Sequence, residues 1–262
     1  MKIIEWLDEL WRYRELFYFL VWRDIKVRYK QTLLGVIWVV IQPFASMIVF
    51  TVFFGKLAKM PSEGVPYAIF SYAALVPWSY FSSAVGRSGN SLIHNMNLIT
   101  KVYFPRIALV VSSTVSGLID YGVSFVVLLG LMQYFDIQIG WKILLVPLLT
   151  IILVMLSLGI GMILSSLNVK YRDIGHIIPF MMQLLLFVSP IIYPISMIPE
   201  RYRGLASLNP LCGIINGFRS AILPSHQVNW QELSLSLAIA LLLLVIGLIY
   251  FRNTERDFAD II

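Results

Sequence analysis

The feature that most constrains the fold is a series of long, nearly uninterrupted apolar runs. Six segments of the 262-residue chain each hold about 20 mostly apolar residues, the length an α-helix needs to cross the hydrocarbon layer of a bilayer. The runs are continuous rather than alternating, which favours helices over a transmembrane β-barrel. We therefore expect an all-α membrane protein with six transmembrane helices, at residues 33–55, 67–85, 107–134, 143–167, 177–193 and 235–251.

Composition leads to the same class of protein. Charged residues make up 13% of the chain and hydrophobic residues 59%, whereas soluble domains carry about 25% charged residues. So few charges cannot cover a water-facing surface of this size, and we therefore expect much of the surface to face lipid.

Cys212 is the one cysteine, which excludes an intrachain disulfide. Glu5, Asp8 and Glu9 interrupt the N-terminal segment, which therefore does not resemble a signal peptide.

The distribution of basic residues predicts the orientation. Fourteen of the 20 Lys and Arg residues lie in the two terminal segments and in the second and fourth loops, and six lie in the other loops. Cytoplasmic loops of membrane proteins carry the excess of Lys and Arg. We therefore expect both termini to be cytoplasmic. The net charge of +6 then belongs to these loops, and we expect no nucleic-acid partner.

A basic collar directly precedes the first predicted span. Arg23, Lys26, Arg28 and Lys30 fall within WRDIKVRYKQTLLGVIW, residues 22–38. These charges would set the orientation and contact anionic lipid headgroups. Upstream, residues 3–15 place their apolar side chains on one helical face, a pattern typical of a helix lying in the membrane interface. That helix is either a simple anchor or a lever that moves with the first span.

The second predicted cytoplasmic loop, residues 86–106, carries apolar and aromatic side chains that have no bilayer to enter. A short helix with such a surface suits a groove on a soluble partner. The alternative is a loop folded onto the cytoplasmic side of the protein itself. The candidate contact residues are Asn95, Leu98, Ile99, Val102, Tyr103, Phe104 and Arg106.

The last predicted external loop is the longest. Its residues 205–223 are apolar, but Asn209, Pro210 and Gly213 interrupt them. Irregular backbone at membrane depth is tolerated only where protein buries it or where it lines water. We therefore predict two short re-entrant helices in this loop.

Several kinds of chemistry have no matching motif. The sequence has no G-x-x-x-x-G-K-[ST] phosphate loop and no H-E-x-x-H, so we expect no catalytic residues, no metal site and no ATP hydrolysis by that route. Residues 158–166, LGIGMILSS, instead suggest a helix-packing surface of small residues. Asp120 is the one acid deep within a predicted span. A lone acid more often pairs with a neighbouring helix or stays protonated than binds a transported ion.

Aromatic residues make up 14% of the chain. Tyr and Trp near span ends anchor helices at the membrane interface, although aromatic faces also stack on sugar rings. Candidates for lining a glycan channel are Tyr72, Trp78, Tyr80, Phe81, Phe187 and Tyr193.

Six blocks, in matching order, carry a resemblance to a known family. Together they closely resemble the ABC-2 type permease subunit of bacterial polysaccharide exporters, the export permeases for O-antigen, capsule and teichoic acid. The resemblance covers nearly the whole chain as a single domain. The blocks are residues 22–43, 91–106, 168–180, 189–199, 209–219 and 251–262.

The resemblance implies an assembly and a cargo. Two copies of the chain would form a pore in the bacterial inner membrane, and two copies of a separate ATPase would bind ATP and Mg, so this chain would need no cofactor. Residues 1–32 would be interfacial, 33–251 the six-helix membrane region and 252–262 a cytoplasmic tail. Residues 91–106 would include the coupling helix, and the broken external segment would form gate helices. The cargo would be a glycan on a polyprenyl-pyrophosphate carrier, with its headgroup near Arg23, Arg28, Tyr29 and Lys30.

Three alternatives remain open at this point. The same fold could export teichoic acid, a lipid or a drug. An ion-coupled carrier is a second alternative, which the single acid Asp120 weakens. A membrane enzyme acting on lipid-linked sugars would need acids placed for a metal or a base. The external loops offer Glu63, Asp136, Glu200 and Glu232, which are widely separated.

Overall fold

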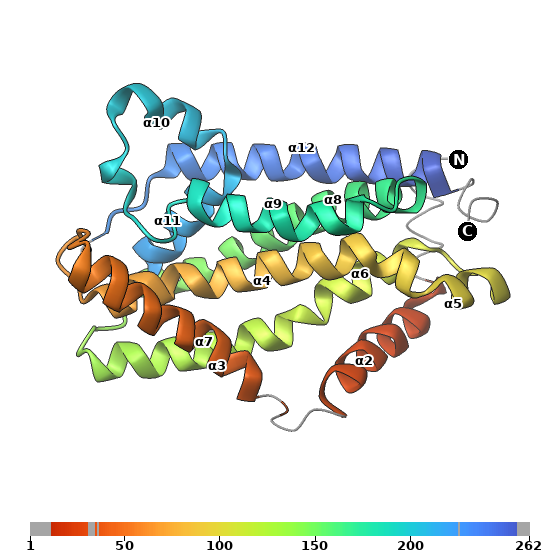
Figure 1. Cartoon of the computed structure of the whole chain (residues 1–262), viewed down its shortest axis with the longest axis horizontal. Coiled ribbons are helices and arrows are strands. Elements are labelled where there is room, and N and C mark those ends of the chain that lie inside the picture. Colours follow the sequence, from red (N-terminus) through yellow and green to blue (C-terminus); the bar gives the residue numbers. More distant parts are fainter. Residues whose placement is uncertain (1–11, 31–34, 36, 225, 256–262) are drawn as a thin grey trace.

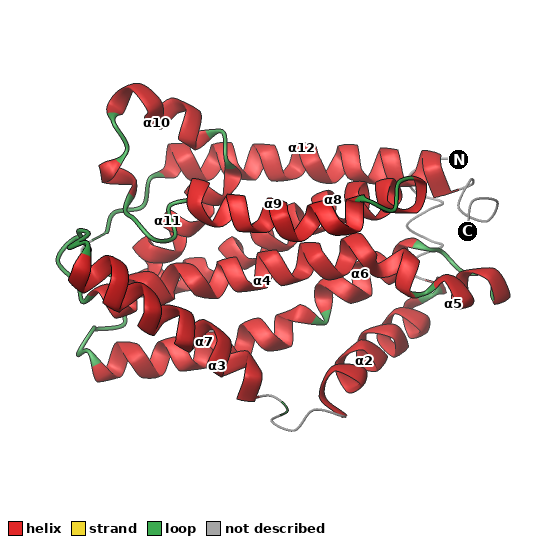
Figure 2. Cartoon of the chain, viewed as in Figure 1, coloured by secondary structure: helices red, strands yellow, loops and turns green. Residues whose placement is uncertain are grey.

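The computed structural model describes residues 12–30, 35, 37–224 and 226–255, and within these ranges every regular element is a helix (Figure 2). The predicted interface helix, residues 3–15, lies almost wholly outside the described residues. The α-helices, in chain order, are α2 (Arg14–Lys30), α3 (Ile37–Phe50), α4 (Tyr67–His94), α5 (Met96–Lys101), α6 (Ile107–Val115), α7 (Gly117–Tyr134), α8 (Val146–Lys170), α9 (Ile174–Val188), α10 (Glu200–Ser207), α11 (Pro210–Ile222) and α12 (Trp230–Glu255).

Four of the predicted spans are confirmed in length and composition among the described residues. They are Ile37–Leu57, Ile107–Tyr134, Trp141–Lys170 and Trp230–Glu255. The first of these continues α3 through a π-helical turn, and the third begins with a 3-10 turn before α8. The second and fifth predicted spans form helices, but α4 is less apolar than these four and α9 is only 15 residues long. The count of six spans therefore stays a prediction.

The long helix α4 lies at the centre of the bundle. It packs against α3, α6, α7, α8, α9 and α11 (Figure 1), and most of its side chains are buried. Many of these are small or polar, such as Ser71, Ser88 and Ser91, whose hydroxyls donate to carbonyls of the preceding turn. A helix surrounded by protein need not be uniformly apolar, which explains why α4 is less apolar than the helices around it.

The chain crosses the bundle repeatedly and so gives it two distinct ends (Figure 1). We call one the α5 end; it holds α5, the turn from α8 to α9 and the last turn of α12. The other, the α10 end, holds the loops after α3 and α7 together with α10 and α11. Of the segments that the charge pattern assigns to the cytoplasm, the second loop, the fourth loop and the described end of α12 lie at the α5 end. That this end faces the cytoplasm remains a prediction.

Small residues bring α8 and α12 into backbone contact, as the sequence LGIGMILSS predicts. A Cβ placed on Gly159 would stand 2.6 Å from the Leu243 carbonyl carbon and 2.7 Å from the Leu244 nitrogen. Gly247 of α12 approaches Gly159 just as closely from the other side. Backbones at this distance leave no room for side chains, so the glycines determine how the two helices pack.

The predicted external segment does form two short helices, with different boundaries from those expected. The exposed α10 begins earlier, at Glu200, whereas α11 is almost wholly buried between α4, α8 and α12. Asn209 separates them and caps α11, because its Oδ1 accepts a hydrogen bond from the Leu211 N–H at 3.1 Å. A re-entrant position in the membrane stays a prediction for both helices.

Arg219 of α11 stabilises the irregular segment after α9. It is buried to 1% exposure, and its Nη1 and Nη2 donate to the Pro190 carbonyl at 2.6 Å and the Ile191 carbonyl at 2.8 Å. Its guanidinium also stacks 3.7 Å from the centre of the Phe70 ring. The arginine thus supplies donors to carbonyls that the broken helix leaves unpaired.

Replacing Gly159 with Ala is expected to destabilise the bundle by about 1–3 kcal/mol, because the added methyl group must push two backbones apart. The measurement is the thermal unfolding temperature of the purified chain in detergent. Gly130→Ala is the matched control, since Gly130 also lies in a predicted span but has open space around its Cβ position. Equal unfolding temperatures for the two variants would contradict this account of the α8–α12 contact.

Candidate functional site

Two cavities meet at a pair of arginines near the α5 end. The first, about 400 Å³, lies between the end of α2, α3, α4 and α7 and is lined by Trp38, Ser79 and Tyr121 among others. The second, about 470 Å³, lies between α2, α4 and the end of α6. Arg28 and Arg87 line both cavities. The boundary between the two spaces is therefore strongly basic.

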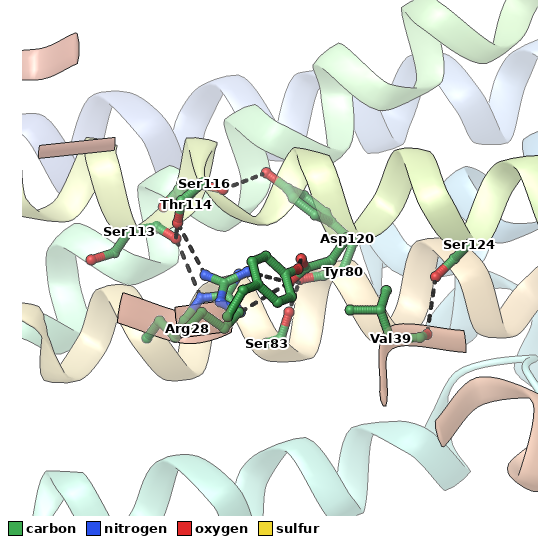
Figure 3. Close-up of polar contacts among 11 residues, drawn as sticks. Arg28, Val39, Tyr80, Ser83, Ser113, Thr114, Ser116, Asp120 and Ser124 are labelled. Carbon is green, nitrogen blue, oxygen red and sulfur yellow. Dashed lines mark hydrogen bonds and ion pairs between the residues drawn. The ribbon is translucent and has the colours of Figure 1, made fainter. Parts of the chain in front are cut away.

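The carboxylate of Asp120, in α7, binds two side chains from the last turn of α2. Arg28 forms an ion pair with its Oδ2 (Figure 3). The Tyr29 hydroxyl donates to Oδ1 of Asp120. Both members of the ion pair are largely buried, with side-chain exposures of 22% for Arg28 and 18% for Asp120. The expectation that this lone acid pairs with a neighbouring helix is confirmed, and the neighbour is α2.

A second arginine approaches the same carboxylate from α4. Arg87 Nη1 lies 3.7 Å from Asp120 Oδ2, and its Nε donates to the Ser113 carbonyl at 3.4 Å. Arg87 Nη2 is buried and has no hydrogen-bond partner among the described residues. Two guanidinium groups thus share one carboxylate oxygen, which leaves the site with an excess of positive charge.

The break between α6 and α7 makes room for this cluster. Ser116 and Gly117 stand at the kink between the two helices, a sequence that commonly bends helices. Arg28 Nη2 donates to Ser116 Oγ at 3.2 Å. A Cβ on Gly117 would collide with the Arg87 guanidinium. The kink therefore offers both a hydrogen-bond acceptor and the space that a larger residue would fill.

Tyr29 is held in its protonated form. Burial, followed by the hydrogen bond to Asp120, raises the pKa of Tyr29 to about 12. A protonated phenol can donate to a carboxylate, and the ionised phenolate could not. Tyr29 therefore acts as a neutral donor at this site throughout the physiological pH range.

The remaining collar residues occupy different positions. Arg23 lines the second cavity and pairs with its neighbour Asp24 at 2.9 Å. Asp24 in turn accepts a hydrogen bond from Ser112 of α6 at 3.3 Å. Lys30, the last residue of α2, is exposed and lines neither cavity. Of the four predicted headgroup residues, Arg28 and Tyr29 form one cluster, Arg23 lies on the adjoining cavity, and Lys30 stands apart.

The predicted coupling segment is only partly available to a partner. Tyr103 is 85% exposed and Val102 52%, whereas Ile99 and Phe104 are buried against Leu92 and the start of α6. Ile99 and Phe104 anchor the segment to the bundle, as the alternative of a loop folded onto the protein itself expects for these two side chains. Docking of a partner on this segment stays a prediction. Leu98 also packs partly against this core.

The two polar residues of the coupling segment serve as connections. Asn95 ends α4, donates to the Ser91 carbonyl at 2.8 Å and lines the second cavity. The Arg106 backbone N–H donates to Glu255 Oε1 at 3.0 Å, and its guanidinium donates to the Glu255 carbonyl. The segment is therefore attached directly to the last turn of α12.

The six aromatic candidates do not form one surface. Trp78 and Tyr80 line the first cavity, where the Tyr80 ring lies 5.7 Å from that of Tyr121. Tyr72 and Phe81 are buried in the core and expose no face to a glycan in this conformation. Phe187 is 54% exposed on α9. The Tyr193 hydroxyl donates to the Phe187 and Val188 carbonyls at 3.1 Å.

Sequence reasoning did not identify Arg87, Ser116 or Tyr121 as parts of the site. Arg87 lies just beyond a predicted span among Gly and Ser residues, a setting that also describes an ordinary loop. One available signal was Asp120 itself, since an acid inside the membrane needs a cationic or hydrogen-bonding partner. Arg87 was one of few candidates close to a predicted span end.

Four helices of the described residues are long and apolar enough to cross a membrane, so the bundle is of the multi-pass membrane class. Residues 15–223 match the family described as the ABC-2 type transporter, and the chain belongs to that family.

Similar proteins cover nearly the full length. The chain is 30% identical over 261 residues to the O-antigen export system permease protein RfbA of Myxococcus xanthus, covering 98% of this chain and 99% of that protein. It is 28% identical to the protein of the same name from Klebsiella pneumoniae, over 92% of each chain. It is 25% identical to the polysialic acid transport protein KpsM of Escherichia coli, over 89% of this chain and 91% of that one.

Arg28→Gln and Asp120→Asn are each expected to destabilise the chain by about 1–3 kcal/mol, because each leaves a largely buried charge less well paired. The loss of unfolding free energy in the double variant should be smaller than the sum of the two single losses, since both changes remove the same interaction. Thermal unfolding in detergent measures this coupling.

The matched control is the exposed Glu200–Arg203 pair, whose atoms lie 3.6 Å apart with side chains 90% and 45% exposed. Its coupling should fall within about 0.5 kcal/mol of zero. If the Arg28–Asp120 changes were simply additive, the pair would not be stabilising α2 against α7.

Proposed function

We propose that this chain is the membrane-spanning permease subunit of an ATP-driven exporter that moves a lipid-linked cell-surface polysaccharide across the bacterial inner membrane. Family membership and the near full-length likeness to proteins named for O-antigen export and polysialic acid transport support this cargo. Two copies of the chain would enclose the path. The single structural observation that carries the proposal is the junction of two cavities at Arg28 and Arg87.

A diphosphate headgroup suits that junction. Guanidinium groups bind phosphate oxygens through forked, charge-assisted hydrogen bonds. Arg23, Arg28 and Arg87 line the second cavity, and Trp78 and Tyr80 line the first. A carrier headgroup in the second cavity would therefore place the attached sugars beside aromatic rings. The exposed Lys30 would contact the headgroups of surrounding lipids.

Energy for transport would come from a separate ATPase. The sequence lacks a phosphate-loop motif, so ATP and Mg would bind to the partner subunit. Tyr103 and Val102 supply the exposed apolar surface at the α5 end. Because Arg106 joins this segment to Glu255 of α12, movement of a docked partner would reach α6 and α12 together.

Replacing Tyr103 with Asp is expected to weaken copurification of the ATPase about tenfold or more, because it places a charge in an apolar contact. Membrane insertion should be unchanged, since the Tyr103 side chain is largely exposed. Tyr134→Asp, at an equally exposed tyrosine of the α10 end, is the control and should leave copurification unchanged. Wild-type copurification by the Tyr103 variant would disprove docking at this segment.

Arg28→Gln is expected to reduce surface glycan and to cause lipid-linked glycan to accumulate inside the cell. It removes a charge-assisted contact of about 1.5–3 kcal/mol, which corresponds to roughly tenfold to hundredfold weaker headgroup binding. Arg28→Lys should restore only part of the export, because an ammonium group keeps the charge and loses the fork.

Arg172→Gln is the control for this experiment, because Arg172 is an exposed basic residue of the turn after α8, also at the α5 end. It changes the net charge equally and should export normally. Full export by Arg28→Gln with normal protein levels would restrict Arg28 to a structural role.

A further inference from the structure

The cation pair at the cavity junction is incompletely neutralised. Arg28 and Arg87 both approach Oδ2 of Asp120, while Arg87 Nη2 is buried without a hydrogen-bond partner among the described residues. The other charged groups lining the second cavity are Arg23 and Asp24, which pair with each other. A single carboxylate therefore neutralises two guanidinium groups only in part. A ligand with more negative charge would neutralise both and accept more of their hydrogen bonds.

Both cavities give access to the two arginines that bind this carboxylate. Asp120 itself lines the first cavity, and Arg28 and Arg87 line both. An anion arriving through the second cavity would meet the two arginines on the side away from Asp120. It would then compete with the carboxylate for the same donors.

We propose that Asp120 is a built-in competitor for the anionic headgroup. Its carboxylate holds the guanidinium groups of Arg28 and Arg87, which a phosphate group entering through the second cavity would bind instead. This inference rests on the headgroup site of the proposed function and adds to it the residue that keeps the site closed. The ligand it names is a diphosphate or phosphodiester.

Displacement has a structural consequence, because Asp120 also holds α2. Arg28 and Tyr29 lie in the last turn of α2. Their contacts with Asp120 and Ser116 connect that turn to the α6–α7 kink. Once a phosphate takes Arg28, the Tyr29 hydroxyl remains the chief donor to the carboxylate. The end of α2 is then held by fewer contacts and is free to move away from α7.

The experiment measures binding of inorganic pyrophosphate to the purified full chain in detergent micelles. Asp120→Asn should bind about tenfold more tightly than the wild type, because an amide competes for the arginines less well than a carboxylate. Arg28→Gln and Arg87→Gln should each bind about tenfold more weakly. Asp173→Asn is the control: it removes an exposed carboxylate, also at the α5 end, and should leave the affinity unchanged.

The outcomes separate this inference from the proposed function. If Asp120→Asn binds no more tightly while the arginine variants bind more weakly, the competition is overturned and the headgroup site stands. If no variant alters the affinity, both ideas fail. A short-chain prenyl diphosphate that binds more tightly than pyrophosphate would identify a lipid headgroup as the ligand. Equal binding would contradict the lipid carrier and leave the competition intact.

A second measurement uses the wild type, so it does not depend on the folding of any variant. Saturating pyrophosphate should increase deuterium uptake in the last two turns of α2, because the hold of Asp120 on Arg28 is lost. Unchanged or reduced uptake there would overturn the proposal.

Discussion

The structure depends on one constraint: polar groups placed inside a largely apolar bundle must find partners within the protein. Two arginines meet it at the two ends. At the α10 end Arg219 donates to carbonyls left unpaired where α9 stops. At the α5 end Arg28 satisfies the acid beside the α6–α7 kink. In both places an arginine supplies hydrogen-bond donors beside an interruption of a helix. A regular helix pairs its own backbone groups and would not need these donors.

This constraint also explains which helices lie where. Uniformly apolar segments such as Trp230–Glu255 tolerate a lipid-facing position. The more polar α4 is surrounded by other helices, where its serines, together with Asn90 and Arg87, find carbonyls and neighbouring side chains. The interior of the bundle is therefore the only environment that suits α4. The candidate site is built there because α4 can bring polar groups into the bundle.

Periodicity and composition predicted the parts of the structure that depend on local sequence. The third span was placed at residues 107–134, the bounds found, and the small residues near Gly159 do form a packing surface. The pairing of Asp120 with Arg28 joins residues 92 positions apart, and no local pattern specifies such a partner. Burial of Ile99 and Phe104 was left undecided for the same reason: an apolar residue suits a partner surface and a core equally well, and only tertiary packing distinguishes the two.

The contacts at the α5 end connect elements that a transport cycle would have to move together. Asp120 joins α2 to the α6–α7 kink, and Arg106 joins the start of α6 to the end of α12 through Glu255. Because α6 takes part in both connections, a force applied at the segment carrying Tyr103 reaches the arginine cluster through one short helix of nine residues. Weakening the Asp120 contact would release the last turn of α2 without disturbing the glycine-mediated α8–α12 packing. The α8–α12 contact and the contact between α2 and α7 thus depend on different kinds of interaction, close backbone packing in the first and charge pairs in the second.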